Sequence, residues 1–369
     1  MIISRTPYRV SFFGGGTDYH NWYQQHGAAV LTSTINHYCY LQCRLLPPFF
    51  EHKSRIVWSK VEEVTSHQDI IHPAVRAVLE YLKINLGVEI THQGDLPARS
   101  GLGSSSAFTV GLLNAMYALR GMISSKRELA CEAIHIERDI LKENVGVQDQ
   151  IETAYGGLNK IVIHANGDFD VSPLVISPSR LHELQDHLLL YFTGISRTAS
   201  DIAGAKMQSI PKKKQELSEM RNMVDIAEDI LTSNKDIALF GELLHESWMI
   251  KRQLTHNISL DFIDACYEKA RQAGAIGGKL LGAGGGGFML IFVKPEQRAS
   301  VQDALQNLLY VPFDFEMGGS QIILYNHPMY DQRTIARRNY QHLHHADNQN
   351  LMLFPTLAHE RLTRLLTVD

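Results

Sequence analysis

The stretch Pro97-Ala98-Arg99-Ser100-Gly101-Leu102-Gly103-Ser104-Ser105-Ser106-Ala107 decides how the rest of the chain is interpreted. It follows an alternating run at 88–92 that is typical of a strand, and it precedes an apolar run at 108–119 that is typical of a buried helix. The serines therefore stand at a helix start, where we expect their hydroxyls and the unpaired N–H groups to point into one small volume and the helix dipole to favour an anion. Gly101 and Gly103 remove side chains that would obstruct a ligand. The pattern predicts a phosphate-binding loop, since a plain helix cap needs one serine and one glycine.

The composition is that of a globular protein with two domains. The chain has 369 residues, of which 44% are hydrophobic and 20% are charged, and this length can supply two separate cores. A net charge of −4 argues against nucleic acid as the main partner. No apolar run is long enough for a membrane span, and the start of the chain lacks a signal-peptide core. The four cysteines form no C-x-x-C pair, so we expect reduced thiols and a cytoplasmic location.

The first part of the chain alternates strands with a glycine-rich turn. Residues 2–13 are expected to form a strand that ends at Gly14-Gly15-Gly16-Thr17-Asp18, where the glycines allow a ligand to approach and Asp18 offers a carboxylate. Such a turn is also common between paired strands. Residues 28–45 predict one or two long strands, residues 55–59 another, and residues 69–86 a helix capped by Asp69.

Two further helices follow the serine-bearing one. Ser125 is expected to cap a helix that runs to about Leu141, and Glu137 near its end can point back toward the loop. Gly146-Val147-Gln148-Asp149-Gln150 opens the next helix, which puts Asp149 at a helix start that favours its charged form. Simple helix capping explains that position equally well.

Paired strands at 158–163 and 169–175 end the first half, and we expect a domain boundary near Ser177-Pro178. The second half begins with a strand at 187–193. Its remaining expected elements are helices at 199–207, 213–231, 237–253 and 260–272, a strand at 288–293, a helix at 297–309, and two short strands that end near Tyr325 and close the domain. This order predicts an α+β sandwich.

The predicted domains are therefore residues 1–177 and 178–329, followed by a polar extension at 330–369. His342, His344 and His345 lie close together in that extension. Their spacing matches no recognised set of metal ligands and no cysteine supports it, so a solvated helix is favoured over a metal site.

The glycine-rich segment Gly282-Ala283-Gly284-Gly285-Gly286-Gly287 contains a formal G-x-G-x-x-G. A dinucleotide-binding turn needs a helix after these glycines, whereas here a strand is predicted to follow. The pair Gly278-Lys279 is followed by Leu280, so the chain has no P-loop. Three separate glycine-rich segments, spread over most of the chain, form a more specific pattern than any one of them.

On these segments the chain resembles the GHMP small-molecule kinase superfamily, which includes galactokinase, homoserine kinase, mevalonate kinase and phosphomevalonate kinase. Residues 6–14, 97–107 and 279–287 match the three motifs of that family, and residues 146–150 are similar to the segment that supplies its catalytic aspartate. The resemblance covers about residues 1–325. It implies a two-domain α+β fold, with an N-terminal βαβ domain like that of ribosomal proteins and a ferredoxin-like C-terminal α/β sandwich.

One departure points to a branch of the family. Galactokinase-type enzymes have Glu-His where this chain has Gly15-Gly16. The resulting Gly-Gly-Gly-Thr-Asp resembles the branch of kinases that act on D-glycero-D-manno-heptose 7-phosphate, with the fucokinases more distant. Residues 58–62, 135–138 and 191–197 are also similar to that branch.

The resemblance implies roles for particular residues. ATP would lie with its phosphates on the serine-bearing loop, and Ser105 and Glu137 would hold Mg²⁺. Asp149 would accept the proton of the attacking anomeric hydroxyl, while Arg9 would keep Asp149 ionised. The residues implied for ATP binding are Pro97, Arg99, Gly101, Leu102, Gly103, Ser104, Ser105 and Ser106. Trp58 is a candidate for stacking on the adenine, although a buried strand tryptophan is the simpler interpretation.

On the sugar side, Asp18 would accept hydrogen bonds from hydroxyl groups. The other residues expected at the sugar are Gly15, Gly16 and Thr17, with Gly284 and Gly285 from the third motif. Arg197 and Lys206 are the candidates for the phosphate of a sugar phosphate, with Lys279 less favoured. Alternatives are a kinase of an unphosphorylated sugar such as fucose, and a non-catalytic protein that senses ATP and sugar. Whether the chain is a monomer or a homodimer is left open.

Overall fold

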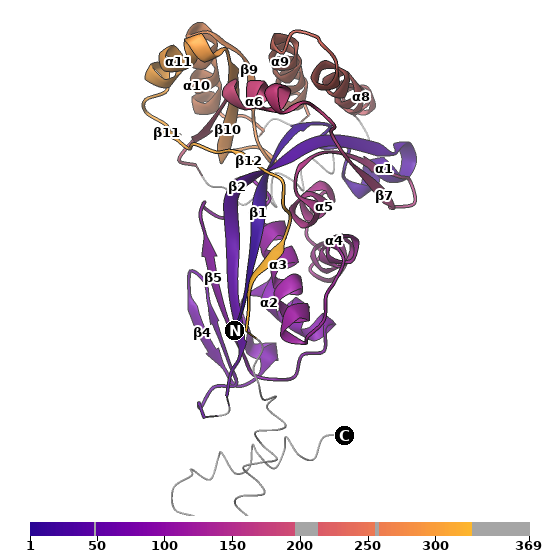
Figure 1. Ribbon diagram of the computed structural model, residues 1–369, viewed down its shortest axis with the longest axis vertical. Coiled ribbons are helices and arrows are strands. Elements are labelled where there is room, and N and C mark those ends of the chain that lie inside the picture. The colour runs from indigo at the N-terminus through magenta and orange to yellow at the C-terminus, as the bar shows by residue number, and fades with distance from the viewer. Residues whose placement is uncertain (48, 196–212, 255–257, 327–369) are drawn as a thin grey trace, which may run out of the picture.

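Two β-sheets and the helices packed on them make up the structure (Figure 1). The computed structural model describes residues 1–47, 49–195, 213–254 and 258–326. Within these ranges the larger sheet has nine strands and the smaller one has four. The larger sheet contains β1 (Ile2–Phe13), β2 (Ala28–Leu45), β3 (Ser54–Val57), β4 (Val61–Val64), β5 (Val88–Gly94), β6 (Leu158–Ile163), β7 (Phe169–Pro173), β12 (Phe315–Glu316) and β13 (Gln321–Tyr325).

β2 is the strand around which the larger sheet is built. β1 runs antiparallel along one of its edges. On the other edge, residues 28–33 of β2 pair with β6 and residues 39–45 pair with β5. The sequence predicted one or two strands here, and the structure has a single strand of 18 residues. β1 ends at Phe13, and this places the first glycine-rich segment at one end of the sheet.

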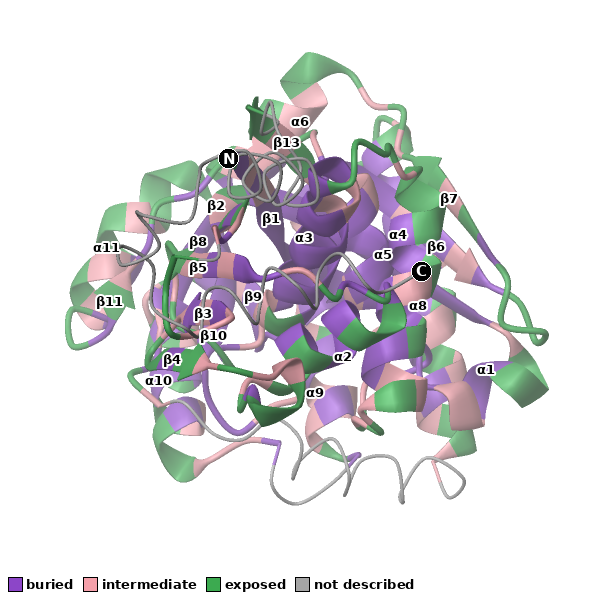
Figure 2. Cartoon of the chain, turned by 90° about the horizontal axis from the view of Figure 1, so that it is seen from below, coloured by how far each residue is buried: buried purple, intermediate pink, exposed green. Residues whose placement is uncertain are grey.

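Helices cover one face of this sheet (Figure 1). They are α2 (Pro73–Tyr81), α3 (Ser104–Leu119), α4 (Lys126–Ile134) and α5 (Gln148–Tyr155), while α1 (His20–His26) lies beyond the end of β1. α3 is apolar on all sides, and 12 of its 16 residues are buried, as expected of a helix inside a core. Figure 2 shows it within the buried centre of the molecule. The serine-bearing loop is therefore attached to a helix that is buried in the core.

Two helix starts test the capping predictions. Ser125 caps α4 through a capping box with Glu128, as predicted, and the helix continues in wider π-helical turns over His135–Ile140. Asp69 does not cap α2, so that prediction is wrong. Asp69 lies in a 3₁₀ turn, and α2 begins at Pro73, with the N–H of Val75 donating to His72 Nδ1. Proline at the first helical position sets this start because its fixed φ already matches a helix.

The smaller sheet has the strand order β11-β8-β10-β9, with antiparallel neighbours throughout. Close glycine contacts attach helix α9 to β9: a Cβ at Gly277 would lie 1.9 Å from the carbonyl oxygen of Gly241. This half confirms the α+β fold class. Its strands are β8 (Leu188–Phe192), β9 (Ala275–Leu280), β10 (Phe288–Val293) and β11 (Leu309–Tyr310), and its helices are α6 (Pro178–Asp186), α8 (Lys214–Thr232), α9 (Ala238–Arg252), α10 (Asp261–Gln272) and α11 (Arg298–Ala304).

The last two strands do not close the second half, and in this respect the sequence prediction is wrong. β12 pairs with β2 and β13 pairs with β1, so the chain returns to the larger sheet. Thr6 Oγ1 and Ser320 Oγ lie 2.8 Å apart, and the N–H of Ser320 donates to the carbonyl of Thr153 on α5. Pairing between strands about 300 residues apart has no local sequence signal. The boundary after residue 177 stays a prediction.

Buried lysine and aromatic side chains join the two halves. Lys279 on β9 is 3% exposed, and its Nζ donates to the carbonyl of Phe12 at 2.7 Å. Phe12 and Phe13 both contact the ring of Phe240 on α9. These contacts fix the end of β1 relative to the smaller sheet. The predicted helix at 199–207 and the extension at 330–369 lie outside the described residues.

Among the described helices, none combines the length and the hydrophobicity that crossing a membrane requires.

We predict that Gly319→Ala destabilises the fold by about 1–3 kcal/mol, since overpacking against fixed atoms has that cost. A Cβ at Gly319 would lie 2.1 Å from the carbonyl oxygen of Ala154 in the backbone of α5. The neighbouring Gly318→Ala is the matched control, because its nearest neighbour is the flexible side chain of Gln321. Thermal unfolding of the two variants measures the difference. Equal melting temperatures would contradict the close docking of this returning segment.

Candidate active site

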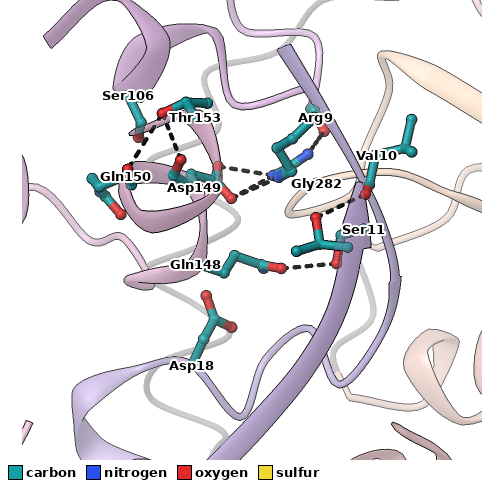
Figure 3. A network of polar contacts seen from close by, with 12 residues as sticks. Arg9, Val10, Ser11, Asp18, Ser106, Gln148, Asp149, Gln150, Thr153 and Gly282 are labelled. Carbon is teal, nitrogen blue, oxygen red and sulfur yellow. Dashed lines mark hydrogen bonds and ion pairs between the residues drawn. The ribbon is translucent and has the colours of Figure 1, made fainter. Parts of the chain in front are cut away.

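A buried arginine joins two of the predicted site segments. Arg9 on β1 is 2% exposed and makes a two-pronged contact with Asp149: Nε donates to Oδ1 at 2.7 Å and Nη2 donates to Oδ2 at 2.8 Å. Its Nη1 donates to the carbonyl of Gly101 at 2.7 Å. Figure 3 shows Arg9 facing the first turn of α5. Two parallel N–H···O bonds fix both the position and the orientation of the Asp149 carboxyl group beside the serine-bearing loop.

The backbone of that loop depends on glycine. Gly101 and Gly103 have φ of +85° and +72°, values that residues with a side chain rarely adopt. A Cβ at Gly103 would also lie 3.1 Å from Cγ of Arg9 and 3.5 Å from Oδ2 of Asp149. The N–H of Arg9 donates to the carbonyl of Leu102. Glycine at 103 therefore lets the arginine and the carboxylate approach the start of α3.

The third glycine-rich segment packs directly on the loop. A Cβ at Gly282 would lie 2.4 Å from Cα of Gly101, and one at Gly287 would lie 2.1 Å from the carbonyl oxygen of Ser100. The N–H of Phe288 donates to that same carbonyl. Lys251 on α9 bonds the start of this segment: its Nζ donates to the carbonyls of Leu280 and Gly282, each at 2.7 Å. The two motifs thus form one backbone-to-backbone contact.

The three serine hydroxyls do not share one volume, contrary to the sequence expectation. The Oγ of Ser104 accepts the N–H of Arg99 at 3.1 Å. Ser105 is exposed, whereas Ser106 is buried and donates to Oε2 of Glu137 at 2.9 Å. The serine in contact with Glu137 is therefore Ser106, while the expectation that Ser105 and Glu137 hold Mg²⁺ stays a prediction. Successive residues on a helix differ by about 100° in direction, so each serine faces a different neighbour.

Glu137 is buried, and one of its oxygens has no hydrogen-bond partner in the described part of the chain. Gln150 Nε2 and Ser106 Oγ both donate to Oε2, at 2.5 Å and 2.9 Å. Among the described residues, Oε1 of Glu137 and Oε1 of Gln150 are buried without a hydrogen bond. Burial raises the pKa of Glu137 from 4.5 to about 7. An unpartnered buried carboxylate oxygen beside an amide oxygen suits a hard cation.

The first glycine-rich segment is tightly folded on itself. Thr17 is buried, and its Oγ1 donates to the carbonyl of Gly14 at 2.8 Å. The N–H of Gly16 donates to Oδ1 of Asp18, which is 1% exposed. A Cβ at Gly146 would lie 1.8 Å from Oδ2 of Asp18. The segment is thus packed against the start of α5, close to Asp149.

Other predicted residues take structural contacts. Trp58 is half-buried, donates from Nε1 to Glu62 Oε1 at 2.7 Å, and lies edge-on to His72. Ser100 Oγ donates to the carbonyl of Pro97. Among the predicted sugar contacts, Gly284 packs on Ile258, and the N–H of Gly285 donates to the carbonyl of Ile258. The Nζ of Lys279 reaches Phe12. The predicted phosphate ligands Arg197 and Lys206 lie outside the described residues.

Two family matches coincide with this geometry. Residues 69–157 match the GHMP kinases N terminal domain, and residues 226–311 match the GHMP kinases C terminal family. The first range contains the serine-bearing loop, Glu137 and Asp149, and the second contains the glycine-rich segment that packs on the loop. The chain contains both the N-terminal and the C-terminal domain of the GHMP kinases. It is therefore a kinase, and GHMP kinases use ATP as the phosphate donor.

Relatives of this GHMP kinase include sugar and mevalonate kinases. It is 29% identical over 324 residues to D-glycero-alpha-D-manno-heptose 7-phosphate kinase of Campylobacter jejuni, covering 83% of this chain and 93% of the relative. A stretch of 224 residues is 32% identical to L-fucokinase/L-fucose-1-P guanylyltransferase of Bacteroides fragilis, covering 58% and 23%. A solved D-glycero-D-manno-heptose 1-phosphate kinase from Bacteroides thetaiotaomicron superposes with a TM-score of 0.72 and 24% identity, covering 90% and 100%. The last match shows the fold.

Sequence reasoning missed three polar residues of this GHMP kinase. Gln148 and Gln150 flank Asp149 in the first turn of α5, and Ser11 on β1 donates to Oε1 of Gln148 at 2.8 Å. Figure 3 shows the three consecutive side chains of α5 pointing to different neighbours. Their place beside the predicted base in Gly-Val-Gln-Asp-Gln was a usable signal, because polar side chains in the first turn of a buried helix need partners.

We predict that Glu137→Gln gains stability over the natural protein as pH rises. Because the pKa of the buried acid is raised, its ionisation disfavours the folded state between pH 4.5 and about 7. The difference in unfolding free energy between variant and natural protein should grow by on the order of 3 kcal/mol from pH 5 to pH 8 without metal. The exposed Glu219→Gln on α8 is the control. Chemical denaturation at both pH values measures the unfolding free energies. A difference between variant and natural protein that does not change with pH would contradict the burial argument.

Proposed function

We propose that this kinase transfers the γ-phosphate of ATP to the anomeric hydroxyl of a sugar phosphate, with D-glycero-D-manno-heptose 7-phosphate as the substrate. The observation that carries the proposal is the match to the Campylobacter jejuni heptose 7-phosphate kinase, which spans nearly the whole of that protein. The replacement of Glu-His by Gly15-Gly16 in the first motif supports the same branch. Arg9 bonds both Asp149 and Gly101, so a carboxylate lies beside the proposed phosphate loop. This supports a catalytic rather than a sensing role, since binding alone needs no base at that place.

In the proposed reaction, the loop at 101–106 holds the phosphates of ATP. N–H groups at the start of α3 and the dipole of this helix stabilise the charge that develops on the transferred phosphoryl group. Asp149 accepts the proton of the anomeric hydroxyl as its oxygen attacks the γ-phosphate. Arg9 pairs with that carboxylate and fixes its distance from the loop. Positioning and charge neutralisation supply most of the rate in phosphoryl transfer.

Magnesium is the cation that we propose for the Glu137 cluster. Glu137 Oε1 would hold it, with the Gln150 amide oxygen and the hydroxyl of Ser105 or Ser106 as further candidates. These are hard oxygen donors, and Mg²⁺ needs few protein ligands because it keeps several waters. When bound, the ion would neutralise charge on the β- and γ-phosphates. Ser106 and Gln150 would orient the carboxylate by occupying its other oxygen.

The sugar is proposed to lie against the first glycine-rich segment and the start of α5. Asp18, Thr17, Gly15 and Gly16 are its proposed neighbours, with Gly284 and Gly285 on the far side of the loop. Arg197 and Lys206 stay our candidates for the substrate phosphate. Adenine stacking on Trp58 also stays a proposal. The Trp58 ring packs edge-to-face with His72, and the adenine would have to stack on the ring beside this contact.

The substrate proposal predicts turnover with heptose 7-phosphate in a coupled ADP-release assay with Mg-ATP. Mannose, fucose, galactose, mevalonate and the heptose 1-phosphate complete the panel. Turnover confined to the heptose 7-phosphate is the expected result. Turnover only with fucose would replace our substrate by that of the fucokinase relatives. ATP binding without any turnover would contradict the catalytic proposal itself.

The mechanism predicts that Asp149→Asn lowers kcat at least about hundredfold, the usual contribution of a general base. The affinity for ATP should change little, because the hydrogen bonds of the Asp149 carboxylate within the described residues all go to Arg9 and none goes to the loop backbone. Initial rates and calorimetric titration with ATP measure the two quantities, and the melting temperature controls for folding. A variant with natural kcat would exclude Asp149 as the base.

A further inference from the structure

We propose that Gln148 is a substrate-recognition residue whose side-chain N–H₂ donates to a sugar hydroxyl oxygen in the space in front of Gly15. The hydroxyl is the one next to the anomeric oxygen. This inference rests on the proposed sugar-kinase function and adds a specificity-determining contact to it. Its evidence is the environment of Gly15, the fixed orientation of the amide, and the position of Gln148 beside Asp149.

Gly15 differs from the other glycines that the structure describes. Each of those has either a positive φ or a neighbouring atom within 3.0 Å of the position that a Cβ would take, so a side chain there would be strained or would clash. Gly15 has neither property. A Cβ at Gly15 would meet only Ser11 Oγ at 3.4 Å and Gln148 Nε2 at 3.6 Å, which is ordinary contact. Glycine at 15 thus leaves a space that an alanine methyl would occupy, and Gln148 Nε2 borders it.

The amide of Gln148 has a defined direction. Gln148 is 9% exposed, and its Oε1 accepts the hydroxyl proton of Ser11, which is itself buried. Within the described part of the chain, Nε2 makes no hydrogen bond to the protein. Gln148 Nε2 is not among the fully buried polar atoms, so a ligand can reach it and an acceptor oxygen there can replace water as its hydrogen-bond partner. Because Nε2 can only donate, the ligand atom must be an acceptor.

The position of Gln148 selects which ligand oxygen it meets. Gln148 immediately precedes Asp149 in the first turn of α5, and Figure 3 shows its side chain between Asp149 and Asp18. The N–H of Val147 donates to the carbonyl of Asp18 at 3.2 Å, which keeps these segments together. If Asp149 faces the anomeric hydroxyl and Asp18 faces other hydroxyl groups of the sugar, the amide between these two carboxylates is close to the hydroxyl next to the anomeric one. An amide donor between two carboxylates then distinguishes hydroxyl positions that carboxylates alone would treat alike.

Gln148→Met tests the proposal, since methionine has a similar length and cannot donate a hydrogen bond. With whichever sugar the substrate panel identifies, we expect KM for the sugar to rise about tenfold, the usual size of one lost neutral hydrogen bond. KM for ATP and the melting temperature should stay at the values of the natural protein. Gln306→Met, on the exposed surface, is the matched control and should leave both KM values unchanged.

The corresponding 2-deoxy sugar separates recognition from a structural role. The natural protein should bind it about tenfold more weakly than the parent sugar, the same loss of one hydrogen bond, whereas Gln148→Met should treat the two sugars alike. Gly15→Ala gives an independent route, because it should raise KM for the sugar without lowering the melting temperature. A natural KM in Gln148→Met, or undiminished discrimination against the 2-deoxy sugar, would overturn the inference while leaving the kinase proposal intact. Absence of turnover by the natural protein with every sugar would instead overturn the proposed function.

Discussion

The contact between Arg9 and its two partners is the constraint on which the rest of the site depends. One guanidinium bonds the carboxylate of Asp149 and the carbonyl of Gly101 at the same time. A buried arginine is unfavourable unless its charge and its N–H groups are all paired. The strand β1, the loop before α3 and the first turn of α5 can therefore meet in only one arrangement. The proposed base and the proposed phosphate loop are positioned by a single side chain.

Glycine makes the remaining approach possible. Gly282 and Gly287 bring the smaller sheet into backbone contact with Gly101 and Ser100, at separations that any Cβ would prevent. Lys279 adds a second connection by reaching from β9 to the end of β1. The second and third glycine-rich segments are thus in direct backbone contact, and Lys279 fixes the strand that leads to the first one. The contacts that hold the two sheets together are also the contacts that form the site. Because these contacts need backbones to approach closely, the family motifs are rich in glycine rather than in charged residues.

Much of this arrangement could be predicted from sequence. The glycine-rich segments, the strands before the first two and the helix after the serine-bearing one are local patterns, and so is the place of Asp149 at a helix start. The exact partner of Glu137 could not be predicted, because a shift of one residue from Ser105 to Ser106 changes the helix face by about 100°. The return of β12 and β13 to the first sheet has no local signal either. The role inferred for Gln148 needed the absence of a clash at Gly15, which only the three-dimensional structure reveals.

The affinity of Arg9→Lys for ATP tests the central claim most directly. Lysine keeps the positive charge but cannot bond Asp149 with two N–H groups and Gly101 with a third. If one arginine holds both the base and the loop, the variant should bind ATP more weakly in calorimetric titration without sugar, and its kcat should fall as well. A variant that folds, binds ATP as the natural protein does and turns over at the natural rate would contradict the account.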